Sequence, residues 1–351
     1  MANIRLSGIR SKLQAKGFPE EVIKRIEETS NKSSNITVGF AINKWYIWCS
    51  KENTDPIQCP IKNNIEFLND MCSQQKAYNT IASYRSAISE IYNYSDGYPI
   101  GRHPDIVKFM ISIRKSNPPP SAPDDPIDII PTLDFIISLG SNEDMSILDL
   151  LQKAAFLIAL GSASRPSDLH RIKLGTLQKT SYGISFSVIN PKETNISISH
   201  GGNKSVSKKI FIDYYEDTEL CPASAVLKLL ERTQEWRTSA NQHEYLFLTT
   251  TLPHQQATVD TISCWLRSIL TQADPFAKAK DVISISASLA QDAGADVFTI
   301  LALGNWSDYS VYQRFYQRGI RKMLERNKIS SKILTQAKNA SLSNQVFEVY
   351  T

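Results

Sequence analysis

The sequence predicts a mainly α-helical protein of two domains, with one small antiparallel β-sheet in the second domain. Three observations predict this α+β class. Apolar residues recur at helical spacing through most of the chain; five prolines fall within residues 115–126; and two β-branched segments, 183–190 and 207–214, stand apart from the helical pattern. With 351 residues, of which 42% are hydrophobic and 21% are charged, the chain is long enough for two domains with substantial cores.

The first domain is predicted to span residues 1–115 and to contain four or five helices. Its clearest helix carries an apolar stripe at helical spacing, made of Ile81, Tyr84, Ile88 and Ile91. Residues 36–49 have the same spacing, through Phe40, Ile47 and Trp48. A further helix is expected over residues 105–115. Residues 116–126 then form a linker, because proline can continue neither a helix nor a central strand.

The second domain is predicted to span residues 127–326. It begins with a strongly apolar helix over 147–161, whose last residue, Gly161, suits a left-handed helix cap. The two β-branched segments follow as strands of a small sheet, separated by a polar turn at 191–205. Helices then return over 223–236, 258–273, 284–293, 296–303 and 310–326. A polar tail occupies residues 327–351.

Charge and cysteine content exclude several classes of protein. Lys and Arg total 39 and Asp and Glu total 35, so the net charge of +4 allows a nucleic-acid partner without requiring one. The five cysteines are scattered and never spaced as CxxC, which indicates neither a disulfide framework nor a zinc site. No stretch approaches the roughly 20 apolar residues of a membrane span, and the start lacks an apolar signal core. We expect a soluble intracellular protein without metal or cofactor.

Two clusters of residues carry candidate chemistry. Residues 304–319 combine tyrosines with arginines; alternatively, they form an amphipathic helix whose buried stripe is Tyr312, Phe315, Tyr316 and Ile320. In the second cluster, 163–170, Arg165 follows the apolar helix and Asp168 comes three residues later. A buried arginine must be paired or bound. Alternatively, the pair only stabilises the start of the next helix.

Taken in order, these motifs resemble those of the tyrosine recombinases. Residues 157–169 are similar to that family's first arginine motif, in which an apolar helix leads into Arg-x-x-(Glu or Asp)-Leu. Residues 293–307 are similar to its "AGAD…I…LGH" stretch, and residues 306–316 to the tryptophan-bearing version in eukaryotic transposon recombinases of the DIRS and Crypton type. Residues 78–88 and 99–104 resemble the helical core-binding domain of the DIRS group. The resemblance covers most of residues 15–325 and implies a helical core-binding domain followed by a tyrosine-recombinase catalytic domain.

The resemblance implies a phosphoryl transfer on DNA. In this family a tyrosine oxygen attacks a phosphodiester, which gives a 3′-phosphotyrosyl link and a free 5′-hydroxyl that then attacks another strand. By position, Tyr316 resembles the nucleophile; Tyr312 and Phe315 are competing alignments, and Phe315 could not react. Neither metal nor cofactor is needed where guanidinium and ammonium groups neutralise the phosphoryl oxygens.

Further residues match the family's catalytic set. Arg165 resembles the first phosphate-binding arginine and Asp168 its supporting acid. Lys192, which follows the first predicted strand, resembles the β-turn lysine that protonates the leaving 5′-oxygen. Lys204 and Lys208 are its alternatives, and a solvated turn lysine is the other interpretation of Lys192.

One position departs from the family's pattern. Lys280 fits the first place of the family's (His or Lys)-x-x-Arg motif, but Ile283 stands where the second arginine is expected. Losing one preorganised donor costs roughly 3–4 kcal/mol, about a thousandfold in rate, so we expect impaired or absent strand transfer. Trp306 stands where the family has His or Trp, which donates a hydrogen bond, or it simply packs in the core. The isoleucine is explained by engineering, by natural decay or domestication, or by rescue from another arginine, for which the candidates are Arg267, Arg314 and Arg318.

The resemblance implies that both domains grip double-stranded DNA. Expected phosphate contacts, each of which is alternatively a solvated lysine or arginine, are Lys76, Arg85, Arg102, Lys108, Arg114, Lys204 and Lys208. The tail, 327–351, is expected to be exchanged between protomers of a dimer or tetramer on DNA, or to be disordered. A eukaryotic member would act in the nucleus, away from membranes. Two further hypotheses are a catalytically inactive DNA-binding protein on the same fold and a helical scaffold that ignores DNA.

Overall fold

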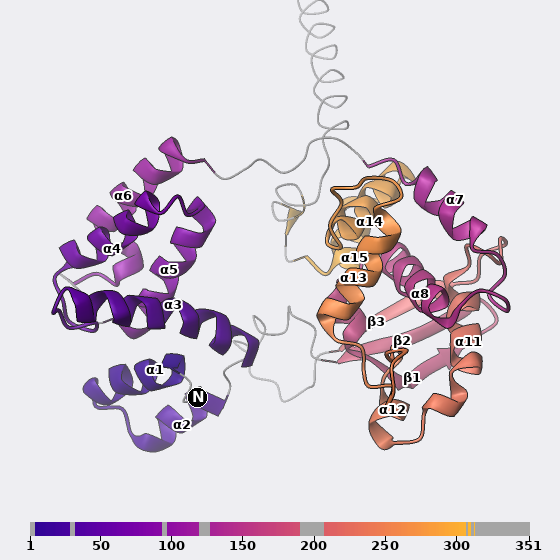
Figure 1. Ribbon diagram of the computed structural model, residues 1–351, viewed down its shortest axis with the longest axis horizontal. Helices are drawn as coiled ribbons and strands as arrows, with labels where there is room; N and C mark the ends of the chain where they lie inside the picture. The colour runs from indigo at the N-terminus through magenta and orange to yellow at the C-terminus, as the bar shows by residue number, and fades with distance from the viewer. Residues whose placement is uncertain are drawn as a thin grey trace, which may run out of the picture. The chain divides into compact units, whose positions relative to one another are not determined.

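The chain divides into two compact units, Met1–Ser121 and Ala122–Thr351. A computed structural model (Figure 1) describes residues 4–28, 32–92, 97–118, 127–189 and 207–306, together with Asp308, Tyr309 and Tyr312; of residues 32–34 and 207 it describes the backbone alone. The boundary between the units falls within the predicted linker, of which residues 119–126 lie outside the described part.

The described elements of unit 1 are all helices or short helical turns. Its elements are α1 (Ile4–Ala15), α2 (Glu20–Glu28), α3 (Lys32–Lys51), α4 (Ile61–Ser73), α5 (Tyr78–Ile91), the 3-10 turn η1 (Ile100–Arg102) and α6 (Pro104–Ser116). The helices enclose an aromatic core in which Phe67 packs edge-on against Trp45, with ring centroids 5.1 Å apart, and against Tyr84 at 5.9 Å. The apolar stripe predicted on α5 is buried along its whole length, which is why this helix lies at the centre of the unit.

The predicted helix over residues 36–49 lies within α3, but its apolar residues do not all face the core. Ile42, Trp45 and Cys49 form the buried face, whereas Phe40 and Ile47 are exposed. The sequence could not separate the two faces, because α3 carries apolar residues on both sides of the helix.

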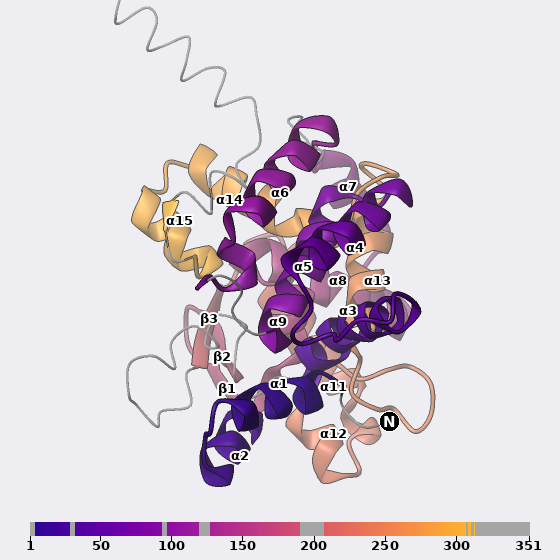
Figure 2. The same cartoon turned by 90° about the vertical axis from the view of Figure 1, so that its left-hand side faces the viewer.

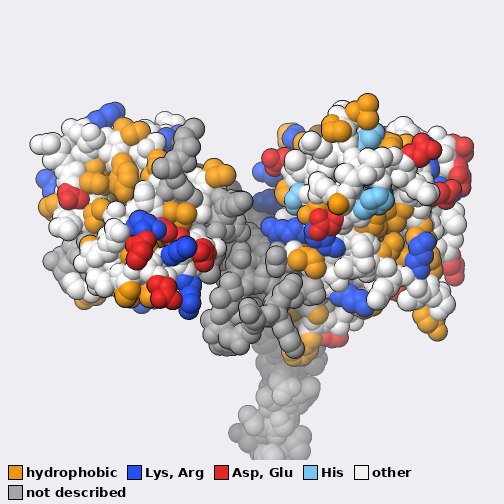
Figure 3. Space-filling view, turned by 90° about the horizontal axis from the view of Figure 1, so that it is seen from below, with side chains coloured by type: hydrophobic (Ala, Val, Ile, Leu, Met, Phe, Trp, Pro, Cys, Tyr) orange, Lys and Arg blue, Asp and Glu red, His pale blue; other side chains and the backbone are white. Residues whose placement is uncertain are grey.

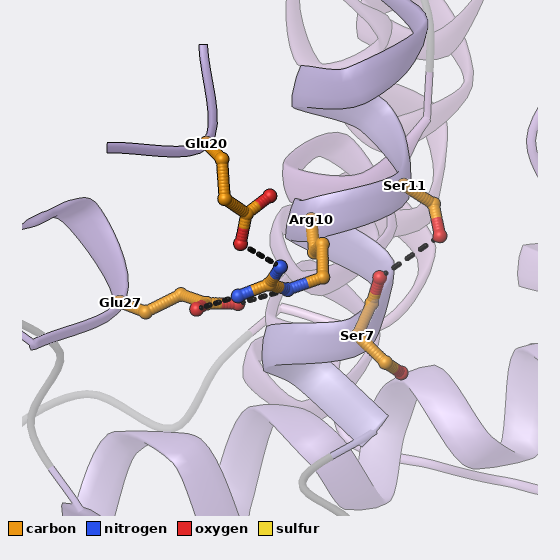
Figure 4. A network of polar contacts seen from close by, with 5 residues as sticks. All are labelled: Ser7, Arg10, Ser11, Glu20 and Glu27. Atoms are coloured by element: carbon orange, nitrogen blue, oxygen red, sulfur yellow. Dashed lines mark hydrogen bonds and ion pairs between the residues drawn. The ribbon is translucent and has the colours of Figure 1, made fainter. Parts of the chain in front are cut away.

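The first two helices form a hairpin that an arginine holds together. Arg10 of α1 donates through Nε to Glu27 Oε1 at 2.9 Å and through Nη1 to Glu20, so that it joins both ends of α2 (Figure 4). These carboxylates raise the pKa of Arg10 above its ordinary value. On the face of unit 1 that carries α1 and α2, basic and acidic side chains lie side by side (Figure 3). The charges there are therefore largely neutralised within the unit.

Unit 2 combines helices with one three-stranded sheet. Its described elements are α7 (Ile130–Ser138), α8 (Ile147–Ser162), α9 (Pro166–His170), β1 (Ile172–Lys179), β2 (Gly183–Ile189), β3 (Ser207–Asp213), α11 (Pro222–Arg232), the 3-10 turn η3 (Gln234–Trp236), α12 (Ala240–Glu244), α13 (Val259–Leu270), α14 (Asp281–Asp292) and α15 (Val297–Gly304). The strands are antiparallel in the order β1-β2-β3. The mainly helical fold with a small antiparallel sheet confirms the predicted class.

The buried helix α8 is the centre of unit 2. It packs against α11, α13, α14 and β3, and nearly all of its residues from Leu150 to Ala159 are buried, Lys153 among them. From the sheet, Ile184, Phe186 and Val188 of β2 enter the same core at every second position. Helices α14 and α15 lie next to each other beyond α8 (Figure 2).

Two predictions about unit 2 were wrong in detail. The strand β1 was not predicted, because its sequence has polar residues and Gly175 in place of regular alternation, and its pairing with β2 is interrupted between Lys173 and Gln178. Helix α8 continues past Gly161 to Ser162, and Ala163 is the residue in the left-handed conformation, with φ 46°. Glycine was expected there because it adopts this conformation without strain.

Candidate active site

The corner between α8 and α9 is held by buried hydroxyl groups. Ser162 Oγ donates to the carbonyl oxygen of Ile158 at 2.7 Å and lies 2.7 Å from Ser164 Oγ. Because the single hydroxyl proton of Ser162 is used on Ile158, Ser164 is the donor in the second bond. Both serines and the intervening Ala163 are buried. Arg165, the next residue, is therefore attached to a corner that has little conformational freedom.

Arg165 and Asp168 meet at the start of α9. The backbone N–H of Arg165 donates to Asp168 Oδ2 at 3.1 Å, and Arg165 Nη1 lies 3.9 Å from the same oxygen. The second distance is that of an ion pair and exceeds a hydrogen bond. The Arg165 side chain is 17% exposed and that of Asp168 is 0% exposed. The carboxylate thus fixes the helix start, as the alternative interpretation expected, while the guanidinium retains access to solvent.

A separate apolar cluster lies against this corner, and we call it the corner cluster. Its buried members are Ala163, Ile283, Ala287, Ile300, Trp306 and Tyr312. They come from the α8–α9 corner, from α14, from α15 and from the residues after α15. The cluster therefore brings Ile283 and Trp306 next to the segment that carries Arg165.

Ile283 is part of the packed interior of the protein. Its side chain is 2% exposed, and the whole run from Val282 to Ala287 on α14 is buried. The isoleucine therefore fills apolar space in the corner cluster, and its correspondence to the family's second arginine stays a prediction. Lys280, three residues earlier at the N-cap of α14, is exposed.

Trp306 packs closely on the end of α15. Asn305 ends this helix in a left-handed conformation, with φ 51°, and the Trp306 backbone N–H returns to Leu301 O at 2.9 Å. The indole then lies so close to Gly304 that a Cβ there would meet ring atoms at 2.4 Å. The Gly-Asn-Trp sequence is thus explained by packing. A hydrogen bond from Trp306 to a substrate stays a prediction.

Tyr312 is fully buried, as the predicted apolar stripe requires. Its ring centroid lies 5.3 Å from that of Trp306 and 5.8 Å from that of Tyr309. Its hydroxyl donates to Gln291 Oε1, near the end of α14, at 2.7 Å. A phenol at 0% exposure with its proton engaged in this way is poorly placed to attack DNA, so the geometry disfavours Tyr312 as the nucleophile.

Some of the remaining predicted site residues lie within the described part of the chain, and others lie outside it. Tyr316, Lys192, Lys204, Arg314, Arg318 and Phe315 lie outside the described residues. Lys208, on β3 opposite Val188, is half-buried, and Arg267 on α13 is exposed. Of the predicted phosphate contacts in unit 1, Arg102, Lys108 and Arg114 are exposed, whereas Lys76 and Arg85 are half-buried. Their roles stay predictions.

Two structural features are absent from the described residues. None of the described helices is long and apolar enough to cross a membrane. The same residues contain no group of three or more His, Cys, Asp or Glu side chains that could hold a metal ion.

No family model and no curated protein matches the chain. Solved structures do. The XerH site-specific recombinase bound to palindromic difH substrate matches with a TM-score of 0.57 and 11% identity, over 89% of this chain and 84% of that one. A lambda integrase dimer bound to a COC′ core site matches with a TM-score of 0.51 and 13% identity, over 83% of this chain and 91% of that one. The Tn1549 transposon integrase in complex with circular intermediate DNA matches with a TM-score of 0.51 and 10% identity, over 92% of this chain and 98% of that one.

The chain has the fold of the tyrosine recombinases. At these identities the likeness establishes the fold alone, and function has to be argued from the site. In this chain the Arg165 corner, α14, α15, Trp306 and Tyr312 meet in one cluster. Arg165, Asp168 and Trp306 stay predicted site residues, whereas the sequence gives no signal for Gln291, because no local pattern relates it to Tyr312.

Proposed function

We propose that the protein is a DNA-binding tyrosine recombinase of the DIRS or Crypton transposon type, with impaired catalysis. The observation that carries the proposal is the corner cluster, which joins the Arg165 corner, position 283 and Trp306 within a tyrosine-recombinase fold. Related folds are known in complexes with DNA, including a post-cleavage complex of XerH. The transposon type rests on the Trp306–Tyr316 motif of the sequence.

In the proposed reaction the Tyr316 hydroxyl releases its proton to water, and its oxygen forms a bond to a DNA phosphorus. The bond from phosphorus to the 5′-oxygen breaks, and that oxygen takes a proton from Lys192. Arg165 neutralises charge on the non-bridging oxygens, because a partly exposed guanidinium at a fixed corner can donate to phosphate with little reorganisation. The free 5′-hydroxyl then attacks a phosphotyrosyl bond and releases Tyr316. No external energy source is needed.

Ile283 is the reason to expect slow cleavage of DNA. An isoleucine that is 2% exposed in an apolar cluster offers no donor to the phosphate. Loss of one preorganised donor corresponds to about a thousandfold in rate. DNA binding is expected to persist, because affinity comes from many phosphate contacts and not from one arginine.

The same observation supports a second candidate function, that of a catalytically inactive DNA-binding protein. A nicked suicide DNA duplex separates the two, because the cleaved fragment diffuses away and even slow cleavage accumulates as a covalent adduct on a denaturing gel. Adduct with the unaltered chain and none with Tyr316→Phe supports the recombinase. Binding without adduct over long incubation supports the inactive protein. Binding that does not weaken as salt rises contradicts both and favours a scaffold that ignores DNA.

Assembly and location complete the proposal. We propose that the protein forms dimers or tetramers on DNA, with the 327–351 segment exchanged between protomers, and acts in the nucleus of a eukaryotic cell. Sedimentation of the full chain with and without a duplex carrying two binding sites tests the assembly. A complex that keeps the mass of one chain on such a duplex contradicts it.

A further inference from the structure

Packing of the ring alone does not explain why residue 312 carries a hydroxyl group. The ring lies between Trp306 and Tyr309 in the corner cluster, and a phenylalanine would fill that space equally well. A buried hydroxyl is unfavourable unless it is hydrogen-bonded. Here it reaches across to Gln291 Oε1 at 2.7 Å, which ties the residues after α15 to the end of α14.

Two members of the corner cluster come shortly before proposed catalytic residues in the sequence. Ala163 is two residues before Arg165, and Tyr312, which makes this bond, is four residues before Tyr316. Ring packing restrains the depth of Tyr312 in the cluster, whereas the directional bond to Gln291 restrains its rotation and its position along α14.

We propose that Tyr312 is a positioning residue, and that its hydrogen bond to Gln291 holds the segment that carries Tyr316 in register with Arg165. This role rests on the proposed function and extends it to two residues that do not contact DNA. Misplacement of a reacting group by about 1 Å can cost on the order of a hundredfold in rate. Loss of the bond therefore slows adduct formation by about ten- to a hundredfold and leaves DNA affinity unchanged.

The experiment compares four variants of the full chain on the nicked suicide duplex at saturating protein. Tyr312→Phe and Gln291→Leu each remove the bond. The double variant removes the same single bond, so all three variants are expected to form the adduct at the same reduced rate. Gln291→Glu keeps an acceptor oxygen and restores most of the rate. Tyr84→Phe, at another buried tyrosine in unit 1, is the matched control and keeps the rate of the unaltered chain. Gel-shift affinity and thermal midpoint are measured for every variant.

The outcomes separate this inference from the function on which it rests. Slow Tyr312→Phe and Gln291→Leu, no further loss in the double variant and recovery in Gln291→Glu, all at unchanged affinity, support the positioning role. An unaltered rate in Tyr312→Phe overturns the positioning role while leaving the recombinase intact. Additive losses in the double variant also overturn it, since the two residues then act independently. Absence of adduct from the unaltered chain overturns the recombinase function and this role together.

Discussion

Replacing Ile283 by arginine tests whether the corner cluster occupies the place of a phosphate-binding side chain. The isoleucine is 2% exposed among Ala163, Trp306 and Tyr312. Without DNA, Ile283→Arg places a guanidinium in apolar surroundings, and an uncompensated buried charge costs about 3–5 kcal/mol. For a unit of this size each kcal/mol lowers the melting midpoint by about 2–4 °C, so a fall of roughly 6–20 °C is expected.

A DNA phosphate supplies the missing counter-charge, so DNA is expected to recover more of the midpoint in Ile283→Arg than in the unaltered chain. The matched control is Ile285→Arg on the same helix, where a side chain that is 3% exposed lies in the main core of unit 2. This control is destabilised to a similar extent, but DNA does not rescue it. Thermal unfolding of both variants with and without duplex is the measurement. Equal recovery in both, or an unchanged midpoint for Ile283→Arg alone, refutes the reasoning.

Three further predictions follow from the described residues. Arg165→Ala lowers the affinity for DNA. It also reduces the slope of the logarithm of the binding constant against the logarithm of salt concentration by about one, which gel shifts across a salt series measure. Ala163→Gly changes unfolding free energy by less than about 1 kcal/mol, because relieved left-handed strain offsets a lost buried Cβ, whereas Ala163→Val loses more; denaturant titration separates them. Burial lowers the pKa of Lys153, so the folded state binds fewer protons and stability rises with pH. Lys153→Met is expected to raise the unfolding free energy at pH 7 and to abolish its increase with pH, which denaturant titrations between pH 7 and pH 10 measure.

Much of the fold could be predicted from the sequence because local patterns determine it. The stripe on α5 has a 3.6-residue period and is buried as expected. The predictions failed where tertiary contacts override local preference. The strand β1 is stabilised by pairing with β2 despite its polar sequence, and Ala163 adopts a left-handed conformation because the serines on either side hold the corner.

The candidate site was predictable only as an order of motifs. Arg165, Ile283 and Trp306 were singled out from their surrounding residues, but their meeting in one cluster depends on how α14 and α15 pack near the end of α8. The bond from Tyr312 to Gln291 spans 21 positions of the chain. Neither residue type predicts the other at that separation, so only the fold reveals the pair.

In the proposed recombinase, position 283 links stability to catalysis. An arginine there would be satisfied only while a phosphate is bound, whereas Ile283 is an apolar member of the cluster that also holds Trp306 and Tyr312 and needs no counter-charge. The isoleucine therefore stabilises the cluster that is proposed to position Tyr316, while it removes a donor that the chemistry would use. These two effects act on different steps, since one concerns alignment and the other concerns charge. The arginine variant is thus expected to bind phosphate more strongly and yet to align the tyrosine less well, so its gain in rate falls short of a thousandfold.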